Sequence, residues 1–149
     1  MKEDYENLKL ENQICFPLYA CSKEIVRRYK PLLDKLDLTY TQYITMMVLW
    51  DKKEINVKNL GNILFLDSGT LTPVLKKIES KGYIERSRAL EDERNLTIKV
   101  TKKGIDLRKK AKNIPEEISK CVKLTEEEAI NLYKTLYKIL NTIGMEGKE

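Results

Sequence analysis

The stretch that decides the fold is LGNILFLDSGTLTPVLKKIESKGYIERSRALEDERNLTIKVTKKG, residues Leu60–Gly104. Its first half has apolar residues at helical spacing. Asp67, Ser68 and Thr70 can cap a helix, which we expect to begin near Thr70 and to end before Gly82. After that glycine the period changes to alternation, so YIERSRAL and NLTIKVT are expected to be two strands joined by a polar tip. A helix pair followed by such a hairpin predicts a winged helix-turn-helix.

Helical periodicity also extends over the N-terminal third of the chain. We expect a long helix over residues 8–29, in which Pro17 either kinks the helix or delays its start. Pro31 and Asp34–Thr39 indicate a break or a second short piece, after which a second helix should begin, capped by Thr39 or Thr41. This second helix is apolar nearly all round, which indicates a central position in the core.

The C-terminal third is expected to be helical as well. A helix from Lys102 through Asn113 restarts near Pro115, and Thr125 with Glu128 forms the capping box of a last helix. The predicted fold class is therefore mainly α with a small β-hairpin. Apolar stripes at both termini favour a homodimer. A winged-helix protein that binds DNA usually contacts two half-sites, which also requires a dimer. The predicted organisation is a DNA-binding lobe at 55–101, flanked by a helical dimerisation region at 1–54 and 102–149.

Composition narrows the classes of function. The 149 residues carry a net charge of +5, which favours a polyanionic partner such as nucleic acid. The sequence has no histidine, so the commonest general base, His-based zinc sites and Ser-His-Asp arrangements are excluded. We therefore expect no enzyme, no cofactor and no metal. The charged N-terminus and the lack of a long apolar run predict a cytoplasmic protein without a membrane partner, whose three cysteines are reduced thiols.

Motifs over nearly the whole chain resemble a known family. DSGTLTP opening the second helix, LKKIESKGYIER leading into the wing and DERN at its tip resemble the winged-helix core of the MarR family of bacterial repressors. The N-terminal NQICFPLYACSKEIVRRYKPLLDKLDLTYTQY resembles the organic-hydroperoxide-sensing OhrR type. The resemblance implies a dimeric repressor that binds duplex DNA with inverted-repeat half-sites and is released when organic hydroperoxide oxidises Cys15.

The expected DNA-binding residues are short hydroxyl side chains at the start of the second helix and cations that follow them. Hydroxyls near a helix N-terminus reach phosphates or base edges, and an arginine at a wing tip can enter the minor groove. Neither strand shows the aromatic platform on which a single-strand binder stacks bases, so duplex DNA is favoured. Asp92, two residues before the tip residue Arg94, is expected to hold Arg94 or to shape the turn, as the resemblance implies. The predicted set is Ser68, Thr70, Thr72, Lys76, Lys77, Arg86, Arg88, Asp92 and Arg94.

The expected redox sensor is Cys15, with Tyr19, Tyr29 and Tyr40 as hydrogen-bond partners. Tyr19 follows one helical turn after Cys15. Tyr29 lies roughly 20 Å along the helix, so it cannot touch Cys15 of its own chain. The resemblance implies that Tyr29 and Tyr40 of the partner subunit complete the pocket. Phenol O–H groups donate to a thiolate and raise its reactive fraction, and oxidation to sulfenic acid forces them to rearrange.

Two further cysteines differ in their expected roles. Cys121 is the candidate resolving cysteine, because the resemblance includes a two-cysteine subtype that forms an intersubunit disulfide. Cys21 is a poor partner for Cys15, since six residues on one helix separate the two sulfurs by about 9 Å along the axis. The principal alternative is a MarR-type repressor that a small aromatic ligand releases without cysteine chemistry. A thiol peroxidase and a protein-interaction module are less favoured.

Overall fold

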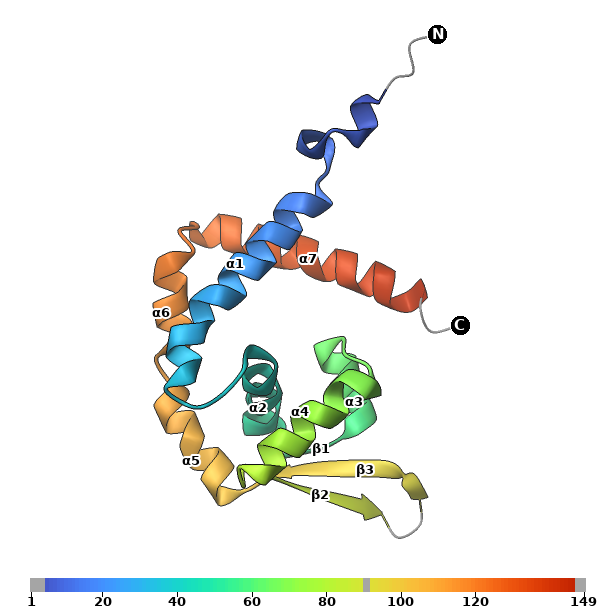
Figure 1. Cartoon of the computed structure of the whole chain (residues 1–149), viewed down its shortest axis with the longest axis vertical. Helices are drawn as coiled ribbons and strands as arrows, with labels where there is room; N and C mark the ends of the chain where they lie inside the picture. The colour runs from blue at the N-terminus through green and yellow to red at the C-terminus, as the bar shows by residue number, and fades with distance from the viewer. Residues whose placement is uncertain (1–4, 90–91, 147–149) are drawn as a thin grey trace.

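The computed structural model describes residues 5–89 and 92–146, without the side chains of residues 89, 92–94, 145 and 146. A lower lobe contains α2, α3, α4 and a small sheet, while α1, α5, α6 and α7 form a frame above and beside it (Figure 1). The prediction of a mainly α fold with a small β-hairpin is confirmed. The helical elements are η1 (Glu6–Leu8), η2 (Leu10–Asn12), α1 (Cys15–Asp34), α2 (Tyr40–Lys52), α3 (Val57–Leu64), α4 (Ser68–Ser80), α5 (Lys102–Ala111), α6 (Ile114–Cys121) and α7 (Glu126–Glu146).

Side-chain caps begin most of these helices, because the first backbone N–H groups of a helix have no partner within it. Thr39 and Gln42 bond reciprocally at the start of α2. Asn56 accepts from the third residue of α3, and Asp67 does the same for α4. The predicted capping box of α7 is also present, with Glu128 accepting from the N–H of Thr125 at 2.8 Å.

Of three expectations about proline, the delayed helix start at Pro17 is confirmed, and the other two are wrong in part. The long helix starts at Cys15 rather than near residue 8, so Pro17 lies in the first turn, where its missing N–H costs no helical bond. Helix α1 does not break at Pro31 but continues to Asp34, and the break lies in the second predicted stretch, before α2 begins at Tyr40. The bond lost at Pro31 involves an exposed turn whose carbonyl water can solvate. Helix α4 begins at Ser68 rather than Thr70, because Asp67 caps it, so Pro73 falls in the second turn.

The sheet has three strands rather than the two expected. Its order is β1 (Glu54–Asn56), β3 (Asp92–Val100), β2 (Ile84–Ala89), and both pairings are antiparallel. In the hairpin Ile84 pairs with Val100, while Ile98 of β3 faces Arg86 on one side and Ile55 of β1 on the other. Strand β1 ties the base of the wing to the start of α3.

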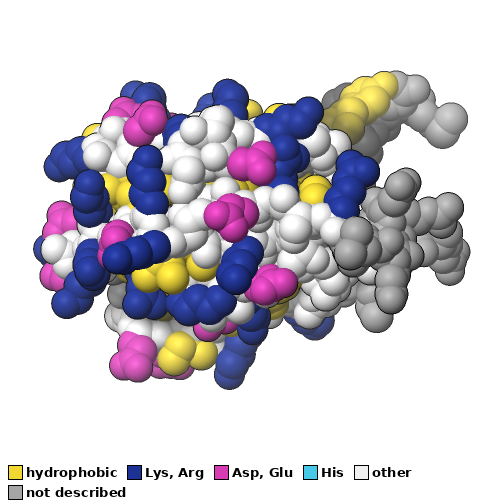
Figure 2. Space-filling view, turned by 90° about the horizontal axis from the view of Figure 1, so that it is seen from below, with side chains coloured by type: hydrophobic (Ala, Val, Ile, Leu, Met, Phe, Trp, Pro, Cys, Tyr) yellow, Lys and Arg dark blue, Asp and Glu magenta, His cyan; other side chains and the backbone are white. Residues whose placement is uncertain are grey.

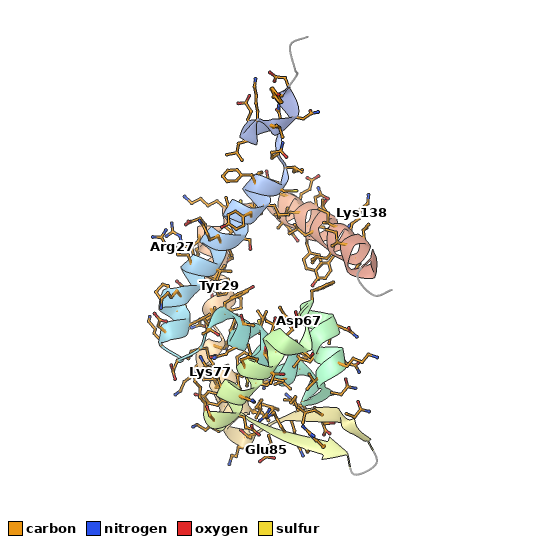
Figure 3. All side chains as sticks on the ribbon, turned by 45° about the vertical axis from the view of Figure 1, so that its right-hand side comes forward. Arg27, Tyr29, Asp67, Lys77, Glu85 and Lys138 are labelled. Atoms are coloured by element: carbon orange, nitrogen blue, oxygen red, sulfur yellow. The ribbon has the colours of Figure 1, made fainter. Side chains whose placement is uncertain are left out.

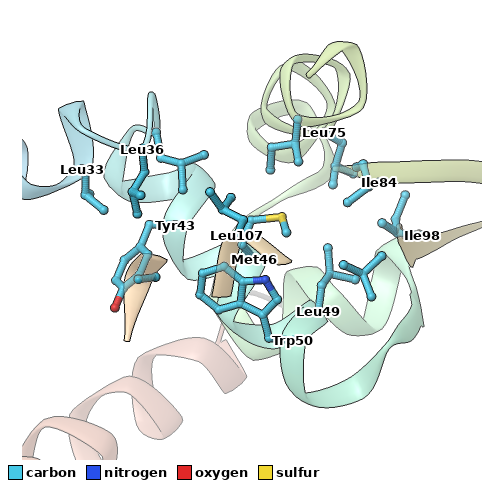
Figure 4. Packing of buried hydrophobic residues seen from close by; sticks show 14 of the residues in the cluster. Leu33, Leu36, Tyr43, Met46, Leu49, Trp50, Leu75, Ile84, Ile98 and Leu107 are labelled. Atoms are coloured by element: carbon cyan, nitrogen blue, oxygen red, sulfur yellow. The ribbon is translucent and has the colours of Figure 1, made fainter. Parts of the chain in front are cut away.

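The core lies between α2, α4 and the sheet, and it extends to the C-terminal end of α1 and to α5 (Figure 4). Trp50 donates its indole N–H to the carbonyl of Gly104 at 2.8 Å, which ties α2 to the start of α5. Gly104 must be a glycine, because a Cβ there would lie 2.2 Å from the carbonyl oxygen of Tyr83. The fully buried aliphatic side chains are Leu33, Met46, Leu49, Leu60, Leu71, Leu75, Ile78, Ile84 and Ile98.

Helix α7 and the N-terminal segment lie outside this core. Among the described residues, neither α7 nor the chain before α1 contributes a buried hydrophobic residue. In Figure 1 the N-terminal turns project away from the rest of the molecule. Large apolar side chains are nevertheless exposed there, namely Tyr5, Leu8, Leu10 and Ile14 before α1, Phe16, Leu18 and Tyr19 on its first turns, and Ile130, Leu132, Tyr133, Tyr137, Ile139, Leu140 and Ile143 on α7.

Candidate functional site

The N-terminal half of α4 presents short polar side chains to solvent. Asp67 accepts the N–H of Thr70 at 2.7 Å and thereby fixes the first turn. Ser68, Thr70 and Thr72 are exposed, and the hydroxyl of Thr72 donates to the carbonyl of Ser68 at 2.7 Å. Lys76, one turn on, is also exposed. Hydroxyls, a lysine and the positive end of the helix dipole therefore share one surface, which suits a phosphate backbone.

The two described arginines of β2 have different surroundings. Side chains alternate along a strand, so Arg86 and Arg88 share the face of β2 that carries the buried Ile84 and looks toward α4. Arg86 meets Glu79 of α4, with Nη2 and Nε lying 2.6 and 2.7 Å from Oε2, and only 24% of its side chain is exposed. This bond holds the pKa of Glu79 below its ordinary value. Arg88 lies nearer the wing tip and is exposed.

The remaining predicted DNA-binding residues lie at the edges of this surface. Lys77 is exposed on α4 and, with Lys81, borders a hollow against the turn between α1 and α2. The side chains of Asp92 and Arg94 lie outside the described residues, so their predicted roles stay predictions. Seen from below, many lysine and arginine side chains cover the lobe, with fewer acidic ones among them (Figure 2). The charge of this face suits a polyanion.

Three tyrosines cluster where α1 meets α2. Tyr29 points from α1 toward α2 (Figure 3), and its ring centroid lies 4.9 Å from that of Tyr40 and 5.7 Å from that of Tyr43. Burial, with smaller contributions from Tyr40 and Tyr43, raises the pKa of Tyr29 to about 12. Burial also raises the pKa of Tyr40 and of Tyr43. The phenols therefore stay protonated at neutral pH and remain hydrogen-bond donors.

Cys15 is the first residue of α1, at the opposite end of that helix from the tyrosine cluster. Fourteen residues of helix, about 21 Å, separate it from Tyr29 of the same chain. Cys15 is a free, exposed thiol, and Tyr19, one turn on, is exposed with Lys23 5.5 Å from its ring centroid. Of the four sensor residues predicted, one chain thus brings together Tyr29 and Tyr40, while Cys15 and Tyr19 lie at the far end of α1.

The other two cysteines are also free and exposed. Cys21 lies on α1 beyond Tyr19. Cys121 is the last residue of α6, and its thiol lies 3.6 Å from the carbonyl oxygen of Glu117. No disulfide joins these three cysteines within the chain. Over the described parts of the chain, no helix is long and apolar enough to cross a membrane, and no group of three or more Cys, Asp and Glu side chains could hold a metal ion.

Comparison with known proteins gives a consistent family. The model of the transcriptional regulator SarA/Rot family matches residues 27–111. The organic hydroperoxide resistance transcriptional regulator of Bacillus subtilis is 46% identical over 147 residues, covering 99% of this chain and 100% of that protein. The regulator SarZ of Staphylococcus saprophyticus is 46% identical over 132 residues, covering 89% and 90%.

Solved structures of similar fold point to the same family of regulators. Reduced AbfR bound to DNA has a TM-score of 0.76 at 32% identity and covers 93% of this chain and 98% of its own. A disulfide form of AbfR has a TM-score of 0.64 at the same identity, covering 91% and 95%. The chain belongs to the MarR-type winged-helix transcriptional regulators. The resemblance of the sequence motifs to the MarR family is thereby confirmed.

In this MarR-type chain, sequence reasoning missed residues whose partners are distant in sequence. Tyr43 was not singled out as a site residue, yet it packs against both Tyr29 and Tyr40. Glu79 was not singled out, although it holds Arg86. Lys81 was also overlooked, and it reaches the turn between α1 and α2. The tyrosine spacing could have suggested Tyr43, because it follows Tyr40 by three residues on one helix face.

Proposed function

We propose that this MarR-type regulator is a dimeric repressor that binds duplex operator DNA with inverted-repeat half-sites and leaves it when organic hydroperoxide oxidises Cys15. The observation that carries the proposal is the placement of the thiol and the phenols. Two half-buried tyrosines with raised pKa values form a pair of donors at one end of α1, and an exposed thiol lies at the other end. The phenols of Tyr29 and Tyr40 can donate hydrogen bonds, and the thiolate of Cys15 can accept them.

The DNA-binding part of the proposal rests on α4 and the wing. Ser68, Thr70 and Thr72 would approach phosphates and base edges, and Lys76, Lys77 and Arg88 would neutralise phosphates. The DNA-bound structure of reduced AbfR supports this assignment, since that protein shares the fold over 93% of this chain. For Arg86 the pairing with Glu79 favours a structural role over direct contact with DNA. Asp92 and Arg94 keep their proposed place at the wing tip.

The dimer is supported by the apolar residues that lie outside the core. Exposed apolar side chains gather on the N-terminal segment, on the first turns of α1 and along α7 between Ile130 and Ile143. A second copy would cover both regions, because isologous contacts bury the same surface on each subunit. If the first helices cross, Tyr29 and Tyr40 of one chain would come within reach of Cys15 of the other. Tyr19 lies one turn from Cys15 and would line the same pocket.

The proposed chemistry is a two-electron oxidation of the thiolate. The sulfur of Cys15 attacks the terminal oxygen of the hydroperoxide, the O–O bond breaks, and the alkoxide leaves as the alcohol after taking a proton. The product is a sulfenic acid. The exposed apolar side chains of Ile14, Phe16 and Leu18 around the thiol would favour an organic peroxide over hydrogen peroxide. The sulfenic acid no longer accepts the same hydrogen bonds as the thiolate, so Tyr29 and Tyr40 would move.

Cys121 is the proposed resolving thiol. Attack of its sulfur on the sulfenic acid of Cys15 from the other subunit would form a disulfide and release water. Its exposure at the end of α6, beyond the core, supports access, and AbfR, for which a disulfide form has been solved, is a relative of similar fold. The alternative within this proposal is that a small thiol caps the sulfenic acid.

The test treats reduced protein with one equivalent of cumene hydroperoxide and measures two quantities. The first is affinity for a duplex that the reduced wild type selects from a random-sequence pool. The second is the covalent state, from non-reducing electrophoresis and intact mass. We expect the wild type to lose affinity and the Cys15→Ser variant to keep it. The matched control is Cys21→Ser, which removes an exposed thiol from the same helix and should respond as the wild type does.

The outcomes separate the alternatives. A covalent dimer that is absent in Cys15→Ser and in Cys121→Ser supports the two-cysteine route. Release with a single oxidised or capped Cys15 and no covalent dimer supports the one-cysteine route. Peroxide-driven release that persists in Cys15→Ser, or a wild type that stays on DNA with an unmodified Cys15, would refute the proposed sensor.

A further inference from the structure

The turn between α1 and α2, residues 35–39, has an unusual backbone. Helix α1 ends with a bond from the N–H of Leu38 back to the carbonyl of Leu33 at 3.1 Å, which places Asp37 in the left-handed region with φ of 53°. Glycine usually occupies that position, because it has no Cβ to crowd the backbone. Leu33, Leu36 and Leu38 are all buried, so the turn is anchored in the core.

Lys81, the residue that follows α4, joins this turn to the reading lobe. Its ammonium group donates to the backbone carbonyl of Asp37 and lies 3.2 Å from the carboxylate of the same residue. It also lies 3.4 Å from the side-chain oxygen of Gln42, which is buried and caps the start of α2. One cation thus bonds to a turn, to a helix cap and, through its own backbone, to the end of α4.

The turn connects the two elements that carry the tyrosine pair. Tyr29 lies on α1 before it, and Tyr40 is the first residue of α2 directly after it. Thr39, the last residue of the turn and the cap of α2, directly precedes Tyr40. A shift of Tyr40 would therefore act on the capping box of α2 and on the turn, and Lys81 bonds to Gln42 of the first and to Asp37 of the second.

We propose that Lys81 is a positioning residue that fixes α4 relative to the α1–α2 turn, so that displacement of the tyrosine pair on oxidation is carried to the DNA-reading helix. The inference rests on the proposed redox release. Lys81 lies at the opposite end of α4 from the exposed hydroxyls of Ser68 and Thr70. Its action is to hold the angle of the helix, and the buried side chains of Leu71, Leu75 and Ile78 supply the pivot.

A second role for Lys81 must be distinguished, since a lysine near a DNA-reading helix can bind phosphate. A phosphate ligand contributes to affinity in the reduced and in the oxidised state alike, so its loss leaves the ratio of the two affinities unchanged. A positioning residue alters that ratio. The ratio of the dissociation constants of oxidised and reduced protein, here the release factor, is therefore the decisive quantity.

The experiment measures the release factor with the selected duplex, before and after one equivalent of cumene hydroperoxide, for four proteins. These are the wild type, Lys81→Met, Lys81→Arg and Lys103→Met. Lys103 is the matched control, because it donates to the carbonyl of Lys81 at 2.8 Å and carries the same charge at the same end of α4, without reaching Asp37. We expect Lys81→Met to lower the release factor at least fivefold, and Lys81→Arg and Lys103→Met to stay within twofold of the wild type.

Equal release factors in Lys81→Met and Lys103→Met overturn the inference while leaving the proposed function standing. A wild type that is not released overturns both. If Lys81→Met does not fold, hydrogen exchange on the wild type decides the question. Oxidation should then raise exchange together in peptides covering 35–42 and 76–84, and a change confined to the first of these overturns the inference.

Discussion

Arg86 and Arg88 make a matched pair of substitutions on one strand. Both are arginines on the same face of β2, yet Arg86 is bonded twice to Glu79 while Arg88 is exposed. Arg86→Gln removes a charge-assisted bond whose two partners are about a quarter and a third exposed, 24% and 36%. Solvent screening limits its contribution to the free energy of unfolding to about 1 kcal/mol. For a chain of this length that lowers the melting temperature by roughly 3 °C.

For DNA binding the order is reversed: Arg88→Gln should have the larger effect and Arg86→Gln the smaller. Arg88→Gln should leave the melting temperature unchanged and remove one phosphate contact per chain. The slope of log affinity against log salt then becomes shallower by about 0.9 per chain, or about 1.8 for a dimer. Arg86→Gln should change that slope little. The assay is fluorescence anisotropy with the selected duplex between about 50 and 200 mM KCl, beside thermal melts followed by circular dichroism.

Acid gives an independent check on the Arg86 bond. The pKa of Glu79 is lowered from 4.5 in the folded protein, mainly by the hydrogen bond from Arg86. The stability it provides is therefore present above pH 4.5 and is lost as pH falls through the lowered value. The difference in melting temperature between the wild type and Arg86→Gln should vanish in that range. An Arg86→Gln variant with unchanged melting temperature, and a salt slope reduced as much as in Arg88→Gln, would refute the reasoning.

Three further predictions concern stability. Gly104→Ala places a Cβ 2.2 Å from the backbone carbonyl oxygen of Tyr83, so it should cost about 2–3 kcal/mol. Gly69→Ala on α4 should cost less, because its Cβ would meet only a side-chain oxygen, that of Asp67, at 3.1 Å; equal thermal melts would contradict this. Tyr29 has a pKa of about 12 in the folded protein against an ordinary 10.0, so the free energy of unfolding should fall as pH rises from 10 to 12. The fall should be less steep in Tyr29→Phe, and equal slopes of the free energy of unfolding against pH in the two proteins would contradict this. Thr125→Ala removes the cap of α7 and should cost about 1 kcal/mol, seen as lost helical ellipticity; an unchanged spectrum and melt would count against it.

Structure that depends on residues close together in the sequence, such as helix caps and strand alternation, could be predicted. Structure that depends on contacts between residues far apart in the sequence could not. The capping residues Thr39, Asn56, Asp67 and Thr101 follow from side chains that bond to backbone groups three residues away. The alternation after Gly82 likewise revealed the hairpin. Strand β1 escaped notice because three residues carry no periodicity, and its pairing depends on β3, about forty residues later.

The candidate site shows the same division. Exposure of the hydroxyls on α4 follows from the helix period, as does the placement of Cys15 and Tyr19 near one end of α1. The contact between Tyr29 and Tyr40 required the intervening turn to fold back, and the local pattern does not specify that turn. The bond between Arg86 and Glu79 joins a helix to a strand, so a charge pattern alone could not separate Arg86 from Arg88.

The separation of Cys15 from the tyrosine pair within a chain has a genetic consequence. If each pocket takes its thiol from one chain and its phenols from the other, two defective alleles can complement each other. A mixed dimer of a Cys15→Ser chain and a Tyr40→Phe chain contains one pocket with both defects and one with neither. Cells that express both alleles would then regain a peroxide response that neither allele gives alone. That response would come from the single intact pocket of each mixed dimer.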